Sequence, residues 1–202
     1  LHYFPLPDTY MIHTFTNGGV TLRWFRDKFC QIEKMAQELG AGDAYDLISK
    51  EVSEVPAGSD GLMMLPHLAG SLAPDVNAKA KGVWFGFTLQ HGRAHFMRAI
   101  MESLGYILKR NIEALGNMGI EVKAIRSLGG GAKSRVWNQI KADINQITLE
   151  TVNTKEAGTL GAAILAGTAV GFFKDVDSAV SSMVSVKERT TPDKEKQEIY
   201  KN

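Results

Sequence analysis

The sequence feature that most constrains the fold is a run of three glycines between a predicted strand and a predicted helix. Residues 120–128 alternate apolar and charged side chains, Gly129, Gly130 and Gly131 follow, and helical spacing resumes at Ser134. Glycines lack a Cβ atom and let the backbone approach a flat base or a phosphate, and the free N–H groups of a helix start favour anionic oxygens. The pattern is typical of a nucleotide site, and by itself it also fits a turn that only joins the two elements.

The glycine run disfavours two other nucleotide-binding motifs. It has neither the G-x-x-x-x-G-K-[ST] spacing of a phosphate loop nor the G-x-G-x-x-G spacing of a dinucleotide fingerprint. A second glycine turn, Asn17-Gly18-Gly19, ends the strand predicted over 10–16 and precedes a helix. Ligands of open α/β sheets lie at the carboxyl ends of strands, so the two turns predict one ligand held between them.

Strands and helices are predicted to alternate, which indicates an α/β domain whose helices cover a partly parallel sheet. Helices are predicted over 20–39, 44–51, 89–115, 134–145, 155–169 and 175–184. Strands are predicted over 10–16, 62–65, 120–128 and 147–152. Asp43 and Thr88 are placed to cap the helices that follow them. Residues 66–86 are predicted to be a long connection, and 187–202 to begin a helix.

Four segments carry predictions about packing. The apolar residues of the first helix form one stripe, which consists of Leu22, Phe25, Phe29, Ile32, Met35, Ala36 and Leu39. The run 63–65 is predicted to be core, and the small residues of 155–169 indicate close packing. The charged residues 187–201 are predicted to be solvated.

The composition limits the function classes. The 202 residues are 44% hydrophobic and 22% charged, which suits one ordinary domain. With 23 basic and 22 acidic residues the net charge is +1, so neither nucleic acid nor an anionic membrane is an expected partner. No apolar run approaches the ~20 residues that a transmembrane helix needs, and no signal peptide is recognised. The lone Cys30 is expected to be a buried thiol, which fits a cytoplasmic protein.

Two other catalytic classes lack a supporting constellation. His91 and His95 share one helix face, but the glutamate of H-E-x-x-H is absent and no clustered third ligand is apparent, so no metal residue is assigned. Ser71 lies in a loop without the base and orienting group that a nucleophile needs. Hydrolase and metal-enzyme chemistry are therefore unsupported.

Four blocks of the chain closely resemble carbohydrate kinases of the FGGY type, and among them the xylulose kinases. The blocks are 17–27, 65–70, 82–95 and 129–143, and 156–163 is similar to the family's closing helix of small residues. Together they cover essentially the whole chain, and their order and spacing are more specific than either glycine turn. The chain departs from the xylulose kinase pattern at 71–74, where Ser-Leu-Ala-Pro replaces a Glu-Arg-Thr-Pro type of run.

Such kinases have two lobes of the actin and hexokinase type, which share a ribonuclease H-like fold, and sugar and nucleotide meet in the cleft between them. The resemblance implies that residues 1–202 are a single domain, the C-terminal nucleotide-binding lobe, with a mixed sheet flanked by helices. It also implies that an N-terminal lobe, absent from this chain, binds most of the sugar. The family's general-base aspartate is expected upstream, so no catalytic residue is assigned here.

The resemblance assigns nucleotide contacts residue by residue. The adenosine pocket would be lined by Gly130, Gly131, Ala132 and Lys133, with Arg135 or Asn138 at its edge. The phosphates would be faced by Gly18 and Gly19, and the nucleotide approached by Arg23.

The reaction implied is in-line transfer of the γ-phosphoryl group of Mg²⁺-ATP to a sugar hydroxyl, with a ketopentose such as xylulose as the expected acceptor. ATP or ADP and the sugar are the expected partners, and a homodimer is one assembly that the sequence leaves open. The alternative is a non-catalytic, actin-like nucleotide-binding or scaffold module, since such lobes can lose chemistry and keep their shape. An upstream aspartate and phosphorylation of a ketopentose by the full-length product would discriminate between them.

Overall fold

The computed structural model describes residues 2–3, 10–11, 18–71, 76–154 and 156–201. The helices are α1 (Gly18–Phe29), α2 (Gln31–Glu38), α3 (Ala44–Ser53), α4 (Arg93–Asn117), α5 (Arg135–Asn145), α6 (Ala157–Ala169) and α7 (Val176–Met183). The strands are β1 (His2–Tyr3), β2 (Tyr10–Met11), β3 (Met63–Leu65), β4 (Val83–Phe85), β5 (Ile125–Ser127), β6 (Leu149–Val152) and β7 (Val186–Thr190). Three 3₁₀ turns are η1 (Ser59–Gly61), η2 (Gly130–Lys133) and η3 (Lys194–Lys196).

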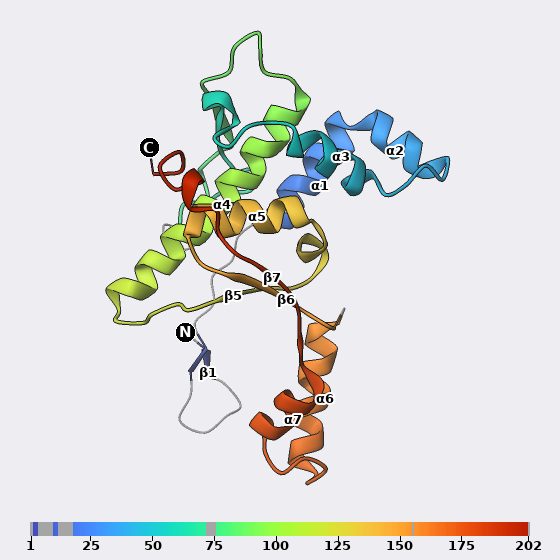
Figure 1. The fold of residues 1–202 in the computed structure, drawn as a ribbon, viewed down its shortest axis with the longest axis vertical. Coiled ribbons are helices and arrows are strands. Elements are labelled where there is room, and N and C mark those ends of the chain that lie inside the picture. Colours follow the sequence, from blue (N-terminus) through green and yellow to red (C-terminus); the bar gives the residue numbers. More distant parts are fainter. Residues whose placement is uncertain (1, 4–9, 12–17, 72–75, 155, 202) are drawn as a thin grey trace.

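A mixed sheet with the order β5-β6-β7 carries the glycine turn. β5 pairs with β6 in parallel, and β6 pairs with β7 in antiparallel fashion. In Figure 1, α5 lies across this sheet, whereas α6 and α7 project beyond it. The mixed sheet with flanking helices agrees with the prediction. The strand predicted over 120–128 is shorter, and only Ile125–Ser127 forms the ladder.

The core lies around α4, which packs against α1, α3, α5 and β3. Its fully buried members include Val52 on α3, Met97 and Ile100 on α4, and Ile140 on α5. Burying a side chain of this kind stabilises the fold by about 1.5–3 kcal/mol. Gly105 permits the close crossing of α4 and α5, since a Cβ atom there would lie 2.6 Å from Ile144 Cδ1.

Helix caps explain several of the helix starts. The Asp43 side chain accepts a hydrogen bond from the backbone N–H of Tyr45 at the start of α3, as the sequence predicts. The prediction for Thr88 is wrong, because α4 begins at Arg93 with Gly92 as its N-cap. The Thr88 N–H instead donates to His91 Nδ1 (2.8 Å) in the turn that precedes the helix.

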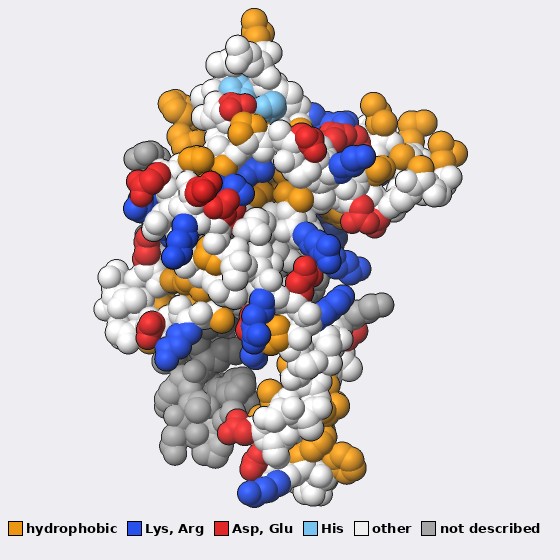
Figure 2. Space-filling model, in the orientation of Figure 1, with side chains coloured by type: hydrophobic (Ala, Val, Ile, Leu, Met, Phe, Trp, Pro, Cys, Tyr) orange, Lys and Arg blue, Asp and Glu red, His pale blue; other side chains and the backbone are white. Residues whose placement is uncertain are grey.

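The helix predicted over 20–39 is in fact two helices, and most of its apolar stripe is not buried. Leu22 and Phe25 on α1 are buried, but Met35 and Leu39 are 61% and 83% exposed. Glu33 is buried instead, and its carboxylate accepts from Arg93 Nη1 (3.0 Å). The backbone leaves helical geometry at Cys30 between the helices, so α2 turns its polar face inward. Figure 2 shows hydrophobic side chains gathered on the surface over α2.

Other packing predictions also need correction. The predicted connection 66–86 contains β4, which pairs with β3 in antiparallel fashion. Along β3 only Met64 is buried, and Met63 and Leu65 are exposed. The small residues of α6 do not bury the helix against its neighbours, because Ile164 is its one buried residue among those described.

The C-terminal segment is a strand followed by a 3₁₀ turn, not the start of a helix. Its Tyr200 is only 2% exposed, so the prediction that this run is solvated fails there. The Tyr200 hydroxyl donates to Glu102 Oε1 (2.9 Å) and accepts from Arg98 Nη2 (3.0 Å), both on α4. These bonds tie the segment to the core.

One predicted strand is described only in part, and one expectation concerns membrane-spanning helices. The strand predicted over 10–16 is seen only as β2, and residues 12–17 lie outside the described residues. Within the described ranges, no helix is long and apolar enough to cross a bilayer.

Cys30 is buried and unpaired as predicted, and burial raises the pKa of its thiol to about 11.

Candidate functional site

The glycine turn joins β5 to α5, as the sequence predicts. Gly129 has φ = 76°, a left-handed conformation that glycine adopts without steric cost. Gly130 and the residues after it form η2, in which the Ala132 N–H donates to the Gly129 carbonyl (3.2 Å). Ser134 then caps α5, because its hydroxyl accepts from the N–H of Trp137 (3.2 Å). The turn is therefore a defined structure held at both ends.

The two sides of the turn differ in a way that suits a ligand. A Cβ atom at Gly131 would overlap the indole ring of Trp137, so the turn rests directly on this ring. A Cβ atom at Gly129 or Gly130 would meet nothing within 4 Å. The first two glycines thus leave a bare main-chain surface that a base or phosphate can approach, and packing beneath the turn requires the third.

Asn138 braces the turn from below. Its side-chain amide donates to the Ala132 carbonyl (2.8 Å), and the residue is only 3% exposed. Its Oδ1 atom is buried without a hydrogen-bond partner among the described residues. A buried acceptor left unpaired costs about 1–3 kcal/mol. The structure thus places Asn138 inside the fold beneath the turn, and not on its open surface.

The charged residues that the sequence assigns to the site are all exposed. Lys133 is exposed at the end of η2, and Arg135 forms an exposed ion pair with Glu188 (Nε to Oε1, 3.2 Å). Arg23 is exposed on α1, and Gly18 and Gly19 are the first two residues of that helix.

One core carries α1, which begins at Gly18, and α5, which follows the Gly129–Gly131 turn. Leu22 and Phe25 of α1 belong to the same hydrophobic cluster as Ile140 of α5, and Trp137 packs against that cluster. The helices that begin at the two turns are therefore fixed to a common support. That one nucleotide lies between the turns stays a prediction.

Sequence reasoning missed the contact between two side chains beneath the turn, those of Lys141 and Ser127. Lys141 lies four residues after Trp137 on α5, and its Nζ atom is 4.7 Å from the centroid of the Trp137 ring. The same Nζ atom donates to Ser127 Oγ (2.9 Å) at the end of β5. The spacing of four was the available signal, but the contact with Ser127 joins separate elements and is not visible in the sequence.

The histidine pair has a local role. His91 accepts from the Thr88 N–H, and His95 Nε2 lies 3.3 Å from Asp60 Oδ2. The part of the chain that the structure describes contains no group of three or more His, Cys, Asp or Glu side chains that could hold a metal ion.

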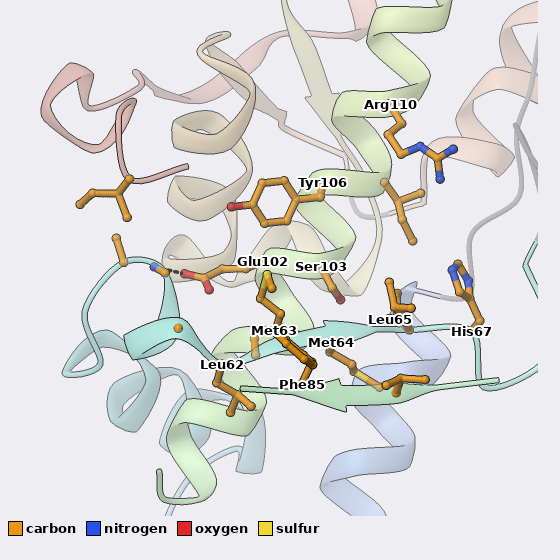
Figure 3. Close-up of a pocket in the computed structure, with 18 residues that line it drawn as sticks. Leu62, Met63, Met64, Leu65, His67, Phe85, Glu102, Ser103, Tyr106 and Arg110 are labelled. Atoms are coloured by element: carbon orange, nitrogen blue, oxygen red, sulfur yellow. Dashed lines mark hydrogen bonds between the residues drawn. The ribbon is translucent and has the colours of Figure 1, made fainter. Parts of the chain in front are cut away.

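A groove of about 760 Å³ lies away from the glycine turns, between α4 and the β3–β4 pair (Figure 3). Its floor is apolar and includes Met63, Leu65 and Phe85, and Tyr106 and Arg110 of α4 form the facing wall. None of the residues assigned to the nucleotide contributes to its lining.

Residues 3–170 match the family model described as the FGGY family of carbohydrate kinases, C-terminal domain. This chain belongs to the FGGY family. A xylulose kinase of Staphylococcus epidermidis is 34% identical to this FGGY chain over 203 aligned residues, which cover 99% of the chain and 39% of the relative. A gluconokinase of Bacillus subtilis is 38% identical over 92% of the chain and 36% of its own length. The FGGY chain thus spans less than half the length of these curated relatives.

Solved structures give the same assignment for the fold. The xylulose kinase from Rhodospirillum rubrum superposes with a TM-score of 0.77 at 29% identity, over 91% of the FGGY chain and 35% of that structure. The gluconate kinase from Lactobacillus acidophilus gives a TM-score of 0.75 at 27% identity, over 92% and 36% respectively. The predicted actin and hexokinase-like fold is confirmed.

Proposed function

We propose that this chain is the nucleotide-binding half of an ATP-dependent carbohydrate kinase. The observation that supports it most is the asymmetric glycine turn, which is open above Gly129 and Gly130 and rests on Trp137 beneath Gly131. A turn of this kind presents bare main chain to a flat base or a phosphate. The turn lies in a domain of the FGGY family, whose matched description is that of carbohydrate kinases.

The proposed contacts divide between the two turns. The adenosine is lined by Gly130, Gly131, Ala132 and Lys133, with Arg135 at the exposed edge. The phosphates lie at Gly18 and Gly19, where the N–H groups and dipole of α1 favour negative charge, and Arg23 approaches one turn later. Mg²⁺ would be bound chiefly by the phosphates and water, as this ion commonly is in kinases. These residues bind and orient ATP for in-line transfer.

The acceptor that we propose is a ketopentose such as xylulose. A xylulose kinase matches 99% of the chain at 34% identity, which supports this choice. The gluconokinase at 38% identity makes gluconate the second candidate, and an autoinducer-2 kinase of Enterobacter sp. at 32% identity is a third relative. Most sugar contacts are assigned to the first lobe of the full-length protein, and the general base to the beginning of the second lobe, upstream of residue 1. We place the full-length protein in the cytoplasm.

Calorimetric titration of the chain with ADP tests the nucleotide site. We expect saturable binding at micromolar to millimolar ADP, and Gly130→Val should abolish it by filling the open side of the turn. Because a Cβ atom at Gly130 meets nothing within 4 Å, this variant should keep the melting temperature of the wild type. Gly116→Ala, on an exposed and open position of α4, is the matched control and should bind normally. Silence of the wild type at millimolar ADP would contradict the proposal.

Activity of the full-length protein tests the reaction and the acceptor. ATP-dependent phosphorylation of xylulose, at a kcat/KM well above that for gluconate, is the expected result. The reverse order would move the assignment to gluconate and leave the kinase intact. ADP binding without turnover of xylulose, gluconate or autoinducer-2 would favour the non-catalytic nucleotide-binding module instead.

A further inference from the structure

A half-buried lysine lies beneath the glycine turn and has no carboxylate partner among the described residues. Lys141 donates from Nζ to Ser127 Oγ (2.9 Å) and stands over the ring of Trp137 (4.7 Å to the centroid). Burial lowers the pKa of this ammonium to about 8, and no other cause contributes to the shift among the described residues. Holding a cation in such a place is unfavourable unless an anion offsets it.

The ionised groups on the elements packed against α5 are engaged elsewhere or exposed. On α5 itself, the Asp143 carboxylate accepts from Gln139 and from the Asp193 N–H and pairs with Lys196. The paired carboxylates on the neighbouring elements include Glu102 with Arg98 and Tyr200 on α4, Glu51 with Arg93 on α3, Glu150 with Arg126 and Arg189 on β6, and Glu188 with Arg135 on β7. The carboxylates of Asp46 on α3 and Glu113 on α4 are exposed, as are the cations of Lys50, Arg110 and Lys133, and Lys109 is partly exposed. The part of the chain that the structure describes therefore offers Lys141 no counterion of its own.

The two residues that Lys141 contacts, Ser127 and Trp137, both lie next to the glycine turn. Ser127 is the last residue of β5, two positions before Gly129. Trp137 is the ring on which Gly131 rests, and its Nε1 donates to the Met101 carbonyl of α4 (3.3 Å). The ammonium thus joins the end of the strand to the floor of the turn, at the carboxyl edge where ligands of α/β sheets bind.

We propose that Lys141 is a positioning residue of the nucleotide site, which holds Ser127 and Trp137 in place beneath the glycine turn and supplies a half-buried positive charge that the anionic nucleotide offsets. The inference rests on the proposed nucleotide site and goes beyond it, because Lys141 acts through Trp137 and the turn. A bound anion favours the charged form of a nearby buried amine. ADP and a proton on Lys141 therefore bind with positive coupling, and each strengthens the binding of the other.

The test is calorimetric titration with ADP at pH 7.5 and pH 9. The second ionisation of a phosphate lies near pH 6, so the charge of the ligand is nearly constant over this range. We expect wild-type affinity to fall about threefold to tenfold as pH rises, since Lys141 loses its proton. Lys141→Met should bind about threefold to tenfold more weakly at pH 7.5 and show no such fall. Lys123→Met, which removes an exposed lysine, is the matched control and should behave as the wild type.

Proton uptake on ADP binding gives a second measurement, and a purely structural role of Lys141 would not affect it. Titrations at pH 8 in two buffers of different ionisation enthalpy should show that ADP binding takes up a fraction of a proton in the wild type. Lys141→Met should show none of this uptake, and Lys141→Arg should retain affinity at pH 9 because its charge persists. The wild-type measurement remains decisive even if both variants fail to fold.

The outcomes separate the two proposals. Equal affinity and equal proton uptake in wild type and Lys141→Met would overturn the role of Lys141 and leave the nucleotide site standing. Wild-type ADP binding without proton uptake at pH 8 would do the same. Absence of ADP binding in the wild type would overturn the nucleotide site and the role of Lys141 with it.

Discussion

At the scale of single residues, the glycine turn depends on what lies under it. Gly131 is glycine because Trp137 occupies the space of a Cβ atom, and Lys141 is held against the same ring. Asn138 fixes the Ala132 carbonyl from within the fold. These contacts support the turn from beneath, and support of this kind reduces the entropy that ligand binding must overcome.

Replacement of Gly131 by alanine should destabilise the fold. The new methyl group overlaps the indole of Trp137, and overpacking of this kind costs about 1–3 kcal/mol. Chemical denaturation of Gly131→Ala should show this loss. Gly130→Ala, at an open position of the same turn, should lose no stability. Equal stability of the two variants would mean that the ring does not set the position of the turn.

Lys141→Met should raise the stability of the fold at pH 7 while it weakens the proposed nucleotide site. Burial lowers the pKa of Lys141 from its ordinary value of 10.5 to about 8. The charged form is thus disfavoured in the folded state by on the order of 3 kcal/mol. Between pH 8 and 10.5 the unfolded chain binds more protons than the folded chain, so wild-type stability rises with pH relative to the variant. Urea denaturation at pH 7 and pH 10 measures this difference, and a variant less stable at pH 7 would contradict it.

At the scale of elements, the sequence predicted most helices but not the orientation of all of them. The helix α3 with its Asp43 cap, the core of α4 and the helix α5 follow from the sequence, whereas the Ser134 cap of α5 was not predicted. The inward face of α2 could not be predicted, because it depends on Glu33 meeting Arg93 from a helix 60 residues away. The strands β4 and β7 were missed for the same reason, since a ladder is a property of two segments.

The candidate site, too, was predicted only in part from the sequence. The position of the glycine turn between β5 and α5 was predicted, because it is encoded in one continuous block. The support beneath it was not, because Ser127 and Lys141 meet only when α5 packs on the sheet.

Loss of the arginine that orients α2 should be costly. Arg93 donates to Glu33 (3.0 Å) and to both oxygens of Glu51 (2.8 Å each), so Arg93→Met leaves the buried Glu33 carboxylate unpaired. Breaking a buried pair in this way costs about 3–5 kcal/mol, and the lower figure applies here because Arg93 is 31% exposed. Thermal unfolding should show the loss, and adding Glu33→Met should recover much of it. No recovery in the double variant would contradict the role given to the buried charge.

At the scale of the whole molecule, several apolar surfaces face solvent. The stripe on α2 and the floor of the groove between α4 and the β3–β4 pair are the clearest. Apolar patches of this kind promote association of a soluble domain. The chain spans 39% of the length of the Staphylococcus epidermidis relative.

The exposed stripe on α2 should govern self-association of the chain. Met35→Lys together with Leu39→Lys should lower the sedimentation-average mass at high protein concentration, because both side chains are mainly exposed. The melting temperature should change little, since neither side chain is part of the core. Met118→Lys, which alters an exposed residue after α4, is the matched control. An unchanged mass in the α2 variant would assign any association to another surface.

The bond from Tyr200 to Glu102 spans 98 residues of sequence, and this span affects the order of folding during synthesis. At about 5–20 residues per second, a ribosome adds residue 200 roughly 5–20 seconds after it has added α4. Until then, the Arg98 and Glu102 side chains lack the hydroxyl that bridges them in the finished fold. The nascent chain therefore exposes part of its central helix for seconds, and in that interval chaperones can bind it.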